Sequence, residues 1–263
     1  MGFGRSRFTS VAAVLLAMLV AVGVPISLSG SNAGAAGAAY NVHSWTDPKG
    51  NHHRVRWNPC QTITYAVNAR LSGHSNRARS KAIADVKSAF SRAGKRTGLN
   101  FSYAGQTREL PKNGANSWAT RQKAAEIVVA WVDQSRARFR SDLLSRQGNG
   151  YASGVGGWML RGWQNSEGHW RAAVGRGFVV INSGDNRRYE SGFGSGVTRG
   201  ALLLHELGHA LGLGHVGTTG ELMYPTMLNR QHSNYKDGDS RGLVKVGRRQ
   251  GCIAGANDIW PQI

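Results

Sequence analysis

Five short stretches of the chain alternate apolar with polar positions or are almost wholly apolar, and each predicts a β-strand. The stretch EIVVAWV, residues 126–132, has hardly a polar position, which is typical of a central strand. Residues 39–59 are instead polar and rich in turn-forming residues, so we expect an irregular lead-in there. The predicted strands cover residues 61–68, 99–105, 126–132, 154–162 and 176–183.

Other stretches repeat apolar residues at helical spacing. Residues 75–98 predict one amphipathic helix, a second is expected to begin after Thr198, which can cap it, and a third to lie around residues 240–249. Strands and helices in this order favour an α+β fold. Neither an internal repeat nor a long linker interrupts residues 60–263, so we expect a single domain there.

The first 38 residues have the layout of a secretory signal peptide. Two arginines precede an apolar run from residue 11 to residue 24, and Ala36-Gly37-Ala38 provides small residues for a cleavage site. A membrane anchor is the alternative, but the run is shorter than the roughly 20 residues that cross a bilayer. We therefore expect a secreted, extracellular protein without a membrane span once residues 1–38 are removed.

The charge balance is strongly basic, with 33 lysines and arginines against 14 aspartates and glutamates and a net charge of +19. Such a field favours electrostatic association with anionic cell-wall or cell-surface polymers. The basic residues are scattered, without the basic blocks and interleaved aromatics of a nucleic-acid-binding module, so nucleic acid is not an expected partner. A codon bias toward arginine is the simpler alternative explanation of the charge.

Two cysteines remain after the predicted signal peptide, Cys60 near the start and Cys252 near the end. An even count in an exported chain predicts a disulfide. The bridge would tie the two ends of the domain together, and it would leave neither thiol to block a metal site.

Histidine is concentrated in the stretch HELGHALGLGH, residues 205–215, which holds three of the nine histidines. His205 and His209 are four residues apart on the helix expected after Thr198, so both rings project from one face. That spacing suits two ligands of a single zinc ion. Glu206 follows the first ligand directly, where it can act as general base toward water at the metal.

His215 can join the other two ligands only if the helix ends between them. In a continuous helix it would lie about 15 Å from His205 along the axis. Gly212 stands where a left-handed residue would end the helix and turn the chain. Ligation by His205, His209 and His215 leaves one position of a tetrahedral zinc open, which is the mark of a catalytic rather than a structural site.

The stretch from His205 to His215 resembles the extended zinc motif of the metzincin metallopeptidases. Met223, within Leu222-Met223-Tyr224-Pro225, looks like their Met-turn, and this local sequence is most similar to the matrixin branch. The resemblance implies a twisted five-stranded mixed sheet with three helices and a zinc cleft along an edge strand. It places Met223 beneath the zinc without binding it. It also implies a zinc-dependent endopeptidase that acts on proteins or peptides.

Three features depart from the matrixin pattern. Val216 stands where matrixins usually have a serine, and no cysteine-switch sequence surrounds Cys60. Residues 133–185 carry few acids, whereas matrixins bind calcium and a structural zinc in loops rich in aspartate and histidine. One catalytic zinc is therefore the expected cofactor, with calcium left open.

We expect substrate to pair with a free edge of the sheet, which gives affinity with little sequence preference. The candidate edge runs from Gly154 to Leu160, where Gly154, Gly156 and Gly157 would allow another backbone to approach closely. In the family it resembles, that edge runs antiparallel to the substrate. The expected walls of a pocket for an apolar side chain just after the scissile bond are Tyr224, Pro225, Thr226 and Met227.

Two alternatives remain beside the endopeptidase. One is a basic, polyanion-binding surface protein with a vestigial zinc site, and the other is a zinc amidase that acts on cell-wall peptides.

For the remaining polar and aromatic residues we favour structural roles over ligand binding. We expect Asp237 and Asp239 to cap a helix rather than bind calcium. We expect the tryptophans to pack against the sheet, namely Trp158, Trp163 and Trp170. The other histidines are expected at surface or core positions, namely His43, His52, His53, His74, His169 and His232.

Overall fold

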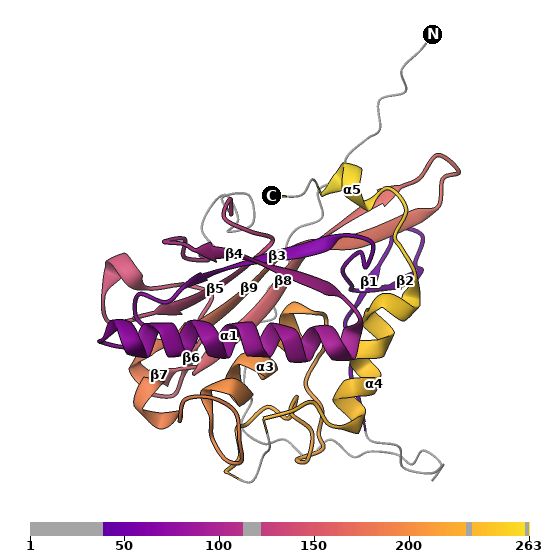
Figure 1. The fold of residues 1–263 in the computed structure, drawn as a ribbon. Helices are drawn as coiled ribbons and strands as arrows, with labels where there is room; N and C mark the ends of the chain where they lie inside the picture. Colours follow the sequence, from indigo (N-terminus) through magenta and orange to yellow (C-terminus); the bar gives the residue numbers. More distant parts are fainter. Residues whose placement is uncertain (1–38, 113–121, 230–232, 261–262) are drawn as a thin grey trace.

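The structure is a computed structural model that describes residues 39–112, 122–229, 233–260 and 263 (Figure 1). The predicted signal peptide, residues 1–38, lies outside the described residues. In the part of the chain that is described, no helix is both long enough and apolar enough to cross a membrane.

A five-stranded mixed sheet forms the centre of the molecule. Its strands are β3 (Thr62–Asn68), β4 (Asn100–Gln106), β5 (Ile127–Val132), β8 (Gly154–Gln164) and β9 (Trp170–Asn182). The strand order is β4-β3-β5-β9-β8. Strands β4, β3, β5 and β9 run parallel, and β8 pairs antiparallel with β9 at the edge. β5 is buried at every position, as the uninterrupted apolar sequence predicts for a central strand.

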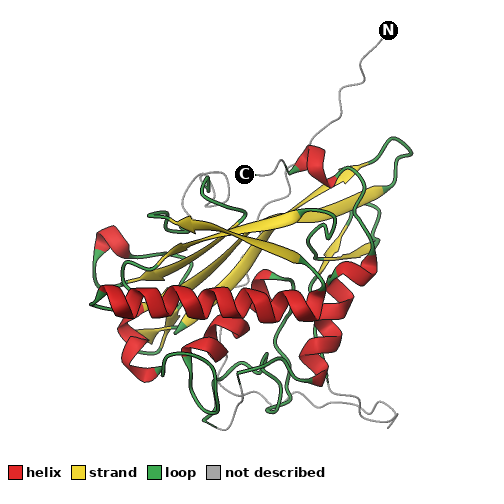
Figure 2. Ribbon diagram, viewed as in Figure 1, coloured by secondary structure: helices red, strands yellow, loops and turns green. Residues whose placement is uncertain are grey.

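The long helix α1 (Asn76–Thr97) crosses one face of this sheet (Figure 2), and α3 (Arg199–Ala210) packs on the same face. Ser75 caps the first of them through its side chain, and Gly98 ends it with a φ of 72°, a conformation that glycine adopts at no steric cost. The helices are α1 (Asn76–Thr97), α3 (Arg199–Ala210), α4 (Asp237–Val246) and α5 (Ala256–Ile259), with short 3-10 turns at Ala137–Phe139, Ser183–Arg188 and Arg248–Gln250. The sheet and the three main helices confirm the expected α+β fold.

The main core lies between the sheet and helices α1 and α3. Phe90 of α1 stacks on Tyr65 of β3, with ring centroids 3.8 Å apart. On the opposite face Phe178 and Val180 of β9 pack against Leu143 and Leu144. The sheet is therefore covered on both faces.

Residues 39–59 are not the irregular lead-in that their polar composition predicts. They contain a hairpin of β1 (Ser44–Thr46) and β2 (His52–Arg54). The turn is closed by the Asp47 carboxylate, which accepts hydrogen bonds from the backbone N–H groups of Lys49 and Asn51 at 2.8 and 3.0 Å. Because the Asp47 side chain fixes the turn through these hydrogen bonds, the hairpin forms without the hydrophobic alternation that usually predicts one.

Strand β9 begins at Trp170, six residues before the strand predicted over residues 176–183. It forms a long hairpin with β8, in which Gln164 pairs with Trp170. Another small hairpin joins β6 (Arg146–Gln147) to β7 (Gly150–Tyr151). The tip of the β8–β9 hairpin projects from the sheet (Figure 1), while Ala172 and Val174 of β9 are buried in the main core.

The predicted disulfide between Cys60 and Cys252 is confirmed, with a Cα–Cα distance of 5.4 Å. It joins the start of the domain to the segment that follows α4. Trp260, after α5, packs against Ala173 of the sheet and donates a hydrogen bond to the Ala173 carbonyl at 2.9 Å. The C-terminal segment therefore closes the face of the sheet opposite α1.

Candidate metal centre

Helix α3 positions the first two histidines. Thr198 caps its N-terminus by accepting a hydrogen bond from the N–H of Ala201. The leucines on its buried faces fix the helix against the sheet and α1. His205 and His209 consequently project from one side of the helix, as their spacing predicts.

The third histidine arrives through the turn at the end of α3. Gly212 has a φ of 104°, and its N–H donates to the His209 carbonyl. The N–H of Leu213 donates to the Gly208 carbonyl, which closes the helix end. The predicted turn at Gly212 is thus present, and it carries His215 back toward the helix.

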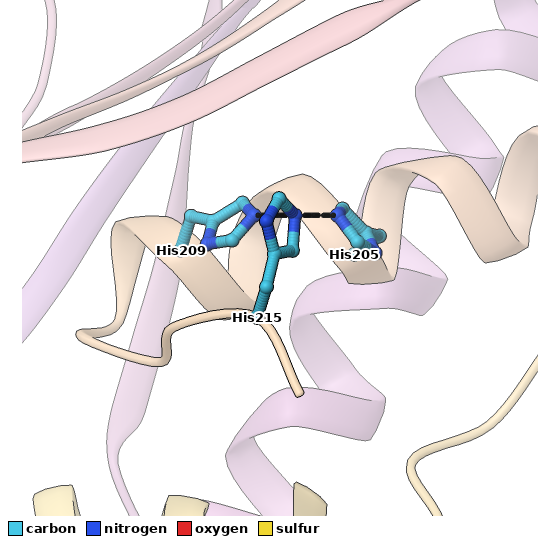
Figure 3. Close-up of side chains that lie close together, drawn as sticks. All are labelled: His205, His209 and His215. Carbon is cyan, nitrogen blue, oxygen red and sulfur yellow. Dashed lines mark hydrogen bonds between the residues drawn. The ribbon is translucent and has the colours of Figure 1, made fainter. Parts of the chain in front are cut away.

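The three Nε2 atoms converge on one point (Figure 3). His205 lies 3.1 Å from His215 and 3.2 Å from His209, and His209 lies 3.1 Å from His215. Nitrogens bound to a tetrahedral zinc at about 2.0–2.1 Å are about 3.3 Å apart, so these spacings match such a site closely.

The outer ring nitrogens determine which tautomer two of these histidines adopt. The Nδ1–H of His205 donates to the Leu222 carbonyl at 2.8 Å, and that of His209 donates to the Leu213 carbonyl at 2.9 Å. Their Nε2 atoms therefore carry lone pairs rather than protons. Lone pairs that face one another repel unless a cation lies between them, so this donor set fits zinc.

Burial keeps all three rings neutral. It lowers the pKa of His205 to about 4, against the opposing hydrogen bond to Leu222. The pKa of His209 lies well below its ordinary value and that of His215 is also lowered, in both cases chiefly because burial disfavours the charged ring. Neutral imidazole is the form that binds a metal.

Glu206 lies beside this triad in the interface between α3 and β8. Its side chain is buried, and a Cβ atom at Gly154 would lie only 2.7 Å from Glu206 Oε1. Burial raises the pKa of Glu206 to about 8, while a hydrogen bond from the Gly156 backbone lowers it. A cation held by the histidines would oppose the effect of burial, because a nearby positive charge favours the carboxylate.

Met223 lies beneath the zinc helix, where the resemblance places the Met-turn. It is buried, and a Cβ atom at Gly208 would lie 2.5 Å from its sulfur. Its carbonyl accepts the N–H of Val216, next to the third histidine. The segment that holds Met223 therefore supports the metal centre through two backbone carbonyls. That of Leu222 accepts a hydrogen bond from His205, and that of Met223 accepts one from Val216.

A reciprocal pair of carboxylates holds the Met-turn to helix α4, and sequence reasoning missed it. The Asp239 carboxylate accepts the N–H groups of Leu222 and Met223 at 2.7 and 3.2 Å. The Glu221 carboxylate accepts the N–H groups of Gly238 and Asp239 at 3.1 and 2.9 Å. Asp239 also accepts the N–H that precedes α4, so the predicted capping role is present, but its longer-range role has no local signature.

The glycines of β8 lie against residues of the chain itself. Gly154 and Gly156 face Glu206 of the chain's own helix, and a Cβ at Gly156 would overlap the Glu206 backbone. Gly157 faces the Phe178 ring. Gly154 and Gly156 therefore allow α3 to lie close to the sheet. A close approach of substrate to this edge stays a prediction. β8 nevertheless lies at the sheet edge, as expected.

The four residues that follow the Met-turn differ in exposure. Tyr224 and Met227 are half-buried, whereas Pro225 and Thr226 are exposed. Met227 packs against the main core. They share one connection near the metal centre, and their role as a pocket stays a prediction.

Most of the other residues singled out in the sequence have structural contacts. His53 pairs with Asp47 in the β1–β2 hairpin, and Trp170 lies edge-on to Trp45, with ring centroids 5.8 Å apart. His43 is different, because it lies near the metal centre, where its charge contributes to lowering the pKa of His209 and His215. His232 lies outside the described residues. Within them, the histidine triad is the only cluster of three or more residues suited to a metal.

Comparison with known families agrees with this geometry. The matrixin model, Peptidase_M10, matches residues 56–246, which include the sheet, α3 and all three histidines. The chain belongs to the matrixin family of zinc metallopeptidases. The resemblance inferred from the zinc motif and Met223 is thereby confirmed, as is the zinc site of three histidines.

A curated relative agrees over a shorter stretch. Matrilysin of Felis catus is 38% identical over 68 residues, which are 25% of this chain and 26% of that protein. The match thus spans about a quarter of the relative's length. It supports the family assignment.

Proposed function

We propose that the protein is a secreted zinc-dependent endopeptidase in which Glu206 is the general base. The convergence of the Nε2 atoms of His205, His209 and His215 beside a buried glutamate carries this proposal. Its further support is the family match over residues 56–246.

The histidines would hold the zinc, and each residue around them has a defined task. Zinc, when bound, supplies Lewis acidity toward the substrate carbonyl and lowers the pKa of water. Glu206 lies one residue from the first ligand, where its carboxylate can take the proton of the attacking water and return it to the leaving amine. The Leu222 and Leu213 carbonyls keep His205 and His209 in the ligating tautomer.

Substrate is proposed to lie along β8 as an added strand. An edge strand offers unpaired backbone groups to an extended peptide, and β8 pairs only with β9 in this sheet. Tyr224, Pro225, Thr226 and Met227 would then bound the pocket for an apolar side chain after the scissile bond. None of these four carries a charge, which supports the apolar preference.

Secretion is supported by two independent features. The predicted signal peptide precedes the domain, and the Cys60–Cys252 disulfide is of a kind that persists in oxidising compartments.

Association with anionic cell-wall or surface polymers is supported by an arginine cluster at the carboxyl ends of β3 and β5. The guanidinium carbons of Arg70, Arg136 and Arg138 lie 5.2, 5.0 and 5.7 Å from the centroid of the Phe139 ring. Asp133 pairs with Arg136. Three exposed guanidinium groups around one ring form a concentrated positive surface on which an anionic polymer can bind.

One assay separates the endopeptidase from its two alternatives. An unbiased peptide library is incubated with the mature protein, with and without a zinc chelator. The endopeptidase cleaves internal peptide bonds, and the chelator abolishes cleavage. A protein with a vestigial site cleaves nothing yet still binds polyanions, and a wall amidase releases muropeptides while it spares the library. Either of those results would overturn the proposal.

A further inference from the structure

The turn that carries the third zinc ligand is paired with a segment almost at the start of the described chain. The N–H of His43 donates to the Gly212 carbonyl at 2.9 Å, and the N–H of Gly214 donates to the Asn41 carbonyl at 3.0 Å. Val42 and Leu213 form an antiparallel bridge between these two bonds. Residues 40–43, named here the N-terminal strap, thus lie as a short strand along the zinc turn.

Side chains of the strap contact the backbone of the zinc turn. The Asn41 side-chain amide donates to the carbonyl of His215 at 3.2 Å. The imidazole of His43 interacts with the backbone of Leu213, whose carbonyl also accepts the Nδ1–H of His209. Two of the three ligands are therefore held in part through contacts with the strap.

Glycines of the zinc motif make room for this segment. A Cβ atom at Gly214 would lie 2.6 Å from the Asn41 amide nitrogen. A Cβ atom at Gly212 would overlap the carbonyl oxygen of Val55, just after the β1–β2 hairpin. Any larger side chain at either position would push the N-terminal segment away from the turn.

The strap is itself held in place from its other end. The N–H of Val55 donates to the His43 carbonyl at 2.8 Å, and Val55 is fully buried. The His43 ring also lies against Trp158 of β8, with centroids 5.9 Å apart. The matrixin match begins at residue 56, so the strap precedes the part of the chain that the family model covers.

We propose that the N-terminal strap is a positioning element of the metal centre, in which Asn41 and His43 hold the turn Gly212–His215 so that His215 meets the other ligands. No residue of the strap belongs to the histidine triad. Without its contacts, the turn keeps its own helix-end bonds, the Val216–Met223 bond and the burial of Leu213 in the main core, but loses the bonds that Gly212, Gly214 and His215 make with the strap. The third ligand would then sample other positions, and zinc would bind more weakly. The inference concerns metal binding and does not depend on peptidase activity.

Asn41→Asp tests the proposal with almost no change in side-chain shape. It replaces the amide donor that faces the His215 carbonyl with an acceptor. Asn186→Asp is the matched control, because the Asn186 amide also donates to a distant backbone carbonyl, that of Leu71, at 2.8 Å. The zinc dissociation constant of each full-length mature variant is measured by competition with a chromogenic chelator, and the thermal midpoint is measured without metal.

The expected result is a split between metal affinity and metal-free stability. Loss of a contact that orients a ligand typically weakens metal binding by about 10–100-fold, so Asn41→Asp should do so relative to wild type. Asn186→Asp should retain the wild-type zinc affinity, even if its metal-free thermal midpoint falls as much as that of Asn41→Asp. Equal zinc affinities for the two variants would overturn the proposal.

A measurement on the unmodified protein covers the case in which Asn41→Asp does not fold. Hydrogen exchange of the Gly214 amide is followed in the metal-free wild-type protein. Because Asn41 accepts this N–H, the amide should exchange slowly even without zinc. Exchange at the rate of an unprotected amide would show that the strap does not hold the turn.

Discussion

Three glycines around the zinc helix are fixed by what lies against them rather than by backbone conformation. Gly154 and Gly156 of β8 face Glu206, and Gly208 faces Met223. None of the three has a positive φ. Their missing side chains allow the helix to lie close to both the edge strand and the Met-turn.

Replacement of Gly156 by alanine should therefore be costly. The added methyl group overlaps the Glu206 backbone, and both partners belong to regular elements that move little. We expect destabilisation of about 1–3 kcal/mol, which lowers the thermal midpoint by roughly 2–12 °C. Gly220→Ala is the control, since nothing lies within 4 Å of a Cβ there. Equal midpoints for the two variants, measured by calorimetry, would refute the close packing of β8 on α3.

At the scale of elements, the Met-turn and helix α4 stabilise each other through buried carboxylates. Burial raises the pKa of Asp239 to about 6, with a further contribution from the nearby Glu221, whereas the N–H donors of Leu222, Lys236 and Met223 lower it. The native state thus binds this proton more tightly than the unfolded chain, where the ordinary value is 3.8. Stability from this group is complete below pH about 4 and is lost as the pH rises through 6.

Glu221→Gln should reduce that loss. Removal of the Glu221 charge weakens one cause of the raised Asp239 pKa, so unfolding free energy should fall less between pH 4 and pH 6 than in the wild type. The lost hydrogen bond shifts stability by a similar amount at every pH and leaves the slope unchanged. Urea unfolding at four pH values measures the slope, with the exposed Asp237→Asn as control. A wild-type slope in Glu221→Gln would contradict the account.

At the scale of the whole molecule, the protein has a large net positive charge and also a local cluster of arginines. The net charge of +19 acts on any anionic surface, but the cluster around Phe139 brings Arg70, Arg136 and Arg138 together. Long-range charge governs encounter, and it weakens as salt rises. A clustered surface should add affinity that depends on which arginines are present.

Arg70→Ala with Arg138→Ala should reduce the salt concentration at which the protein elutes from a polyphosphate resin. Arg96→Ala with Arg249→Ala is the matched control, because it removes the same charge from exposed positions elsewhere. If net charge alone governed binding, both double variants would elute together, and the cluster would have no special role. We expect the Arg70/Arg138 variant to elute at lower salt.

Local patterns predicted much of this molecule, and non-local contacts account for what they missed. The apolar pattern located the five strands of the central sheet, and the spacing of His205, His209 and Gly212 predicted the metal centre because those residues share one helix and its turn. The contact of Asn41 with His215 joins positions 174 residues apart, and no periodicity encodes it. The bond from Leu222 to Asp239 is likewise invisible until the chain is folded.

The most direct test of the central claim compares wild-type protein with Glu206→Gln for both zinc content and cleavage of an internally quenched peptide. The account predicts one zinc per chain in each protein, because the three histidines are unchanged. It predicts that cleavage by the variant falls by about 100-fold or more, since general-base catalysis typically contributes about 10²–10⁴-fold. A Glu206→Gln variant that holds one zinc and cleaves at the wild-type rate would contradict it.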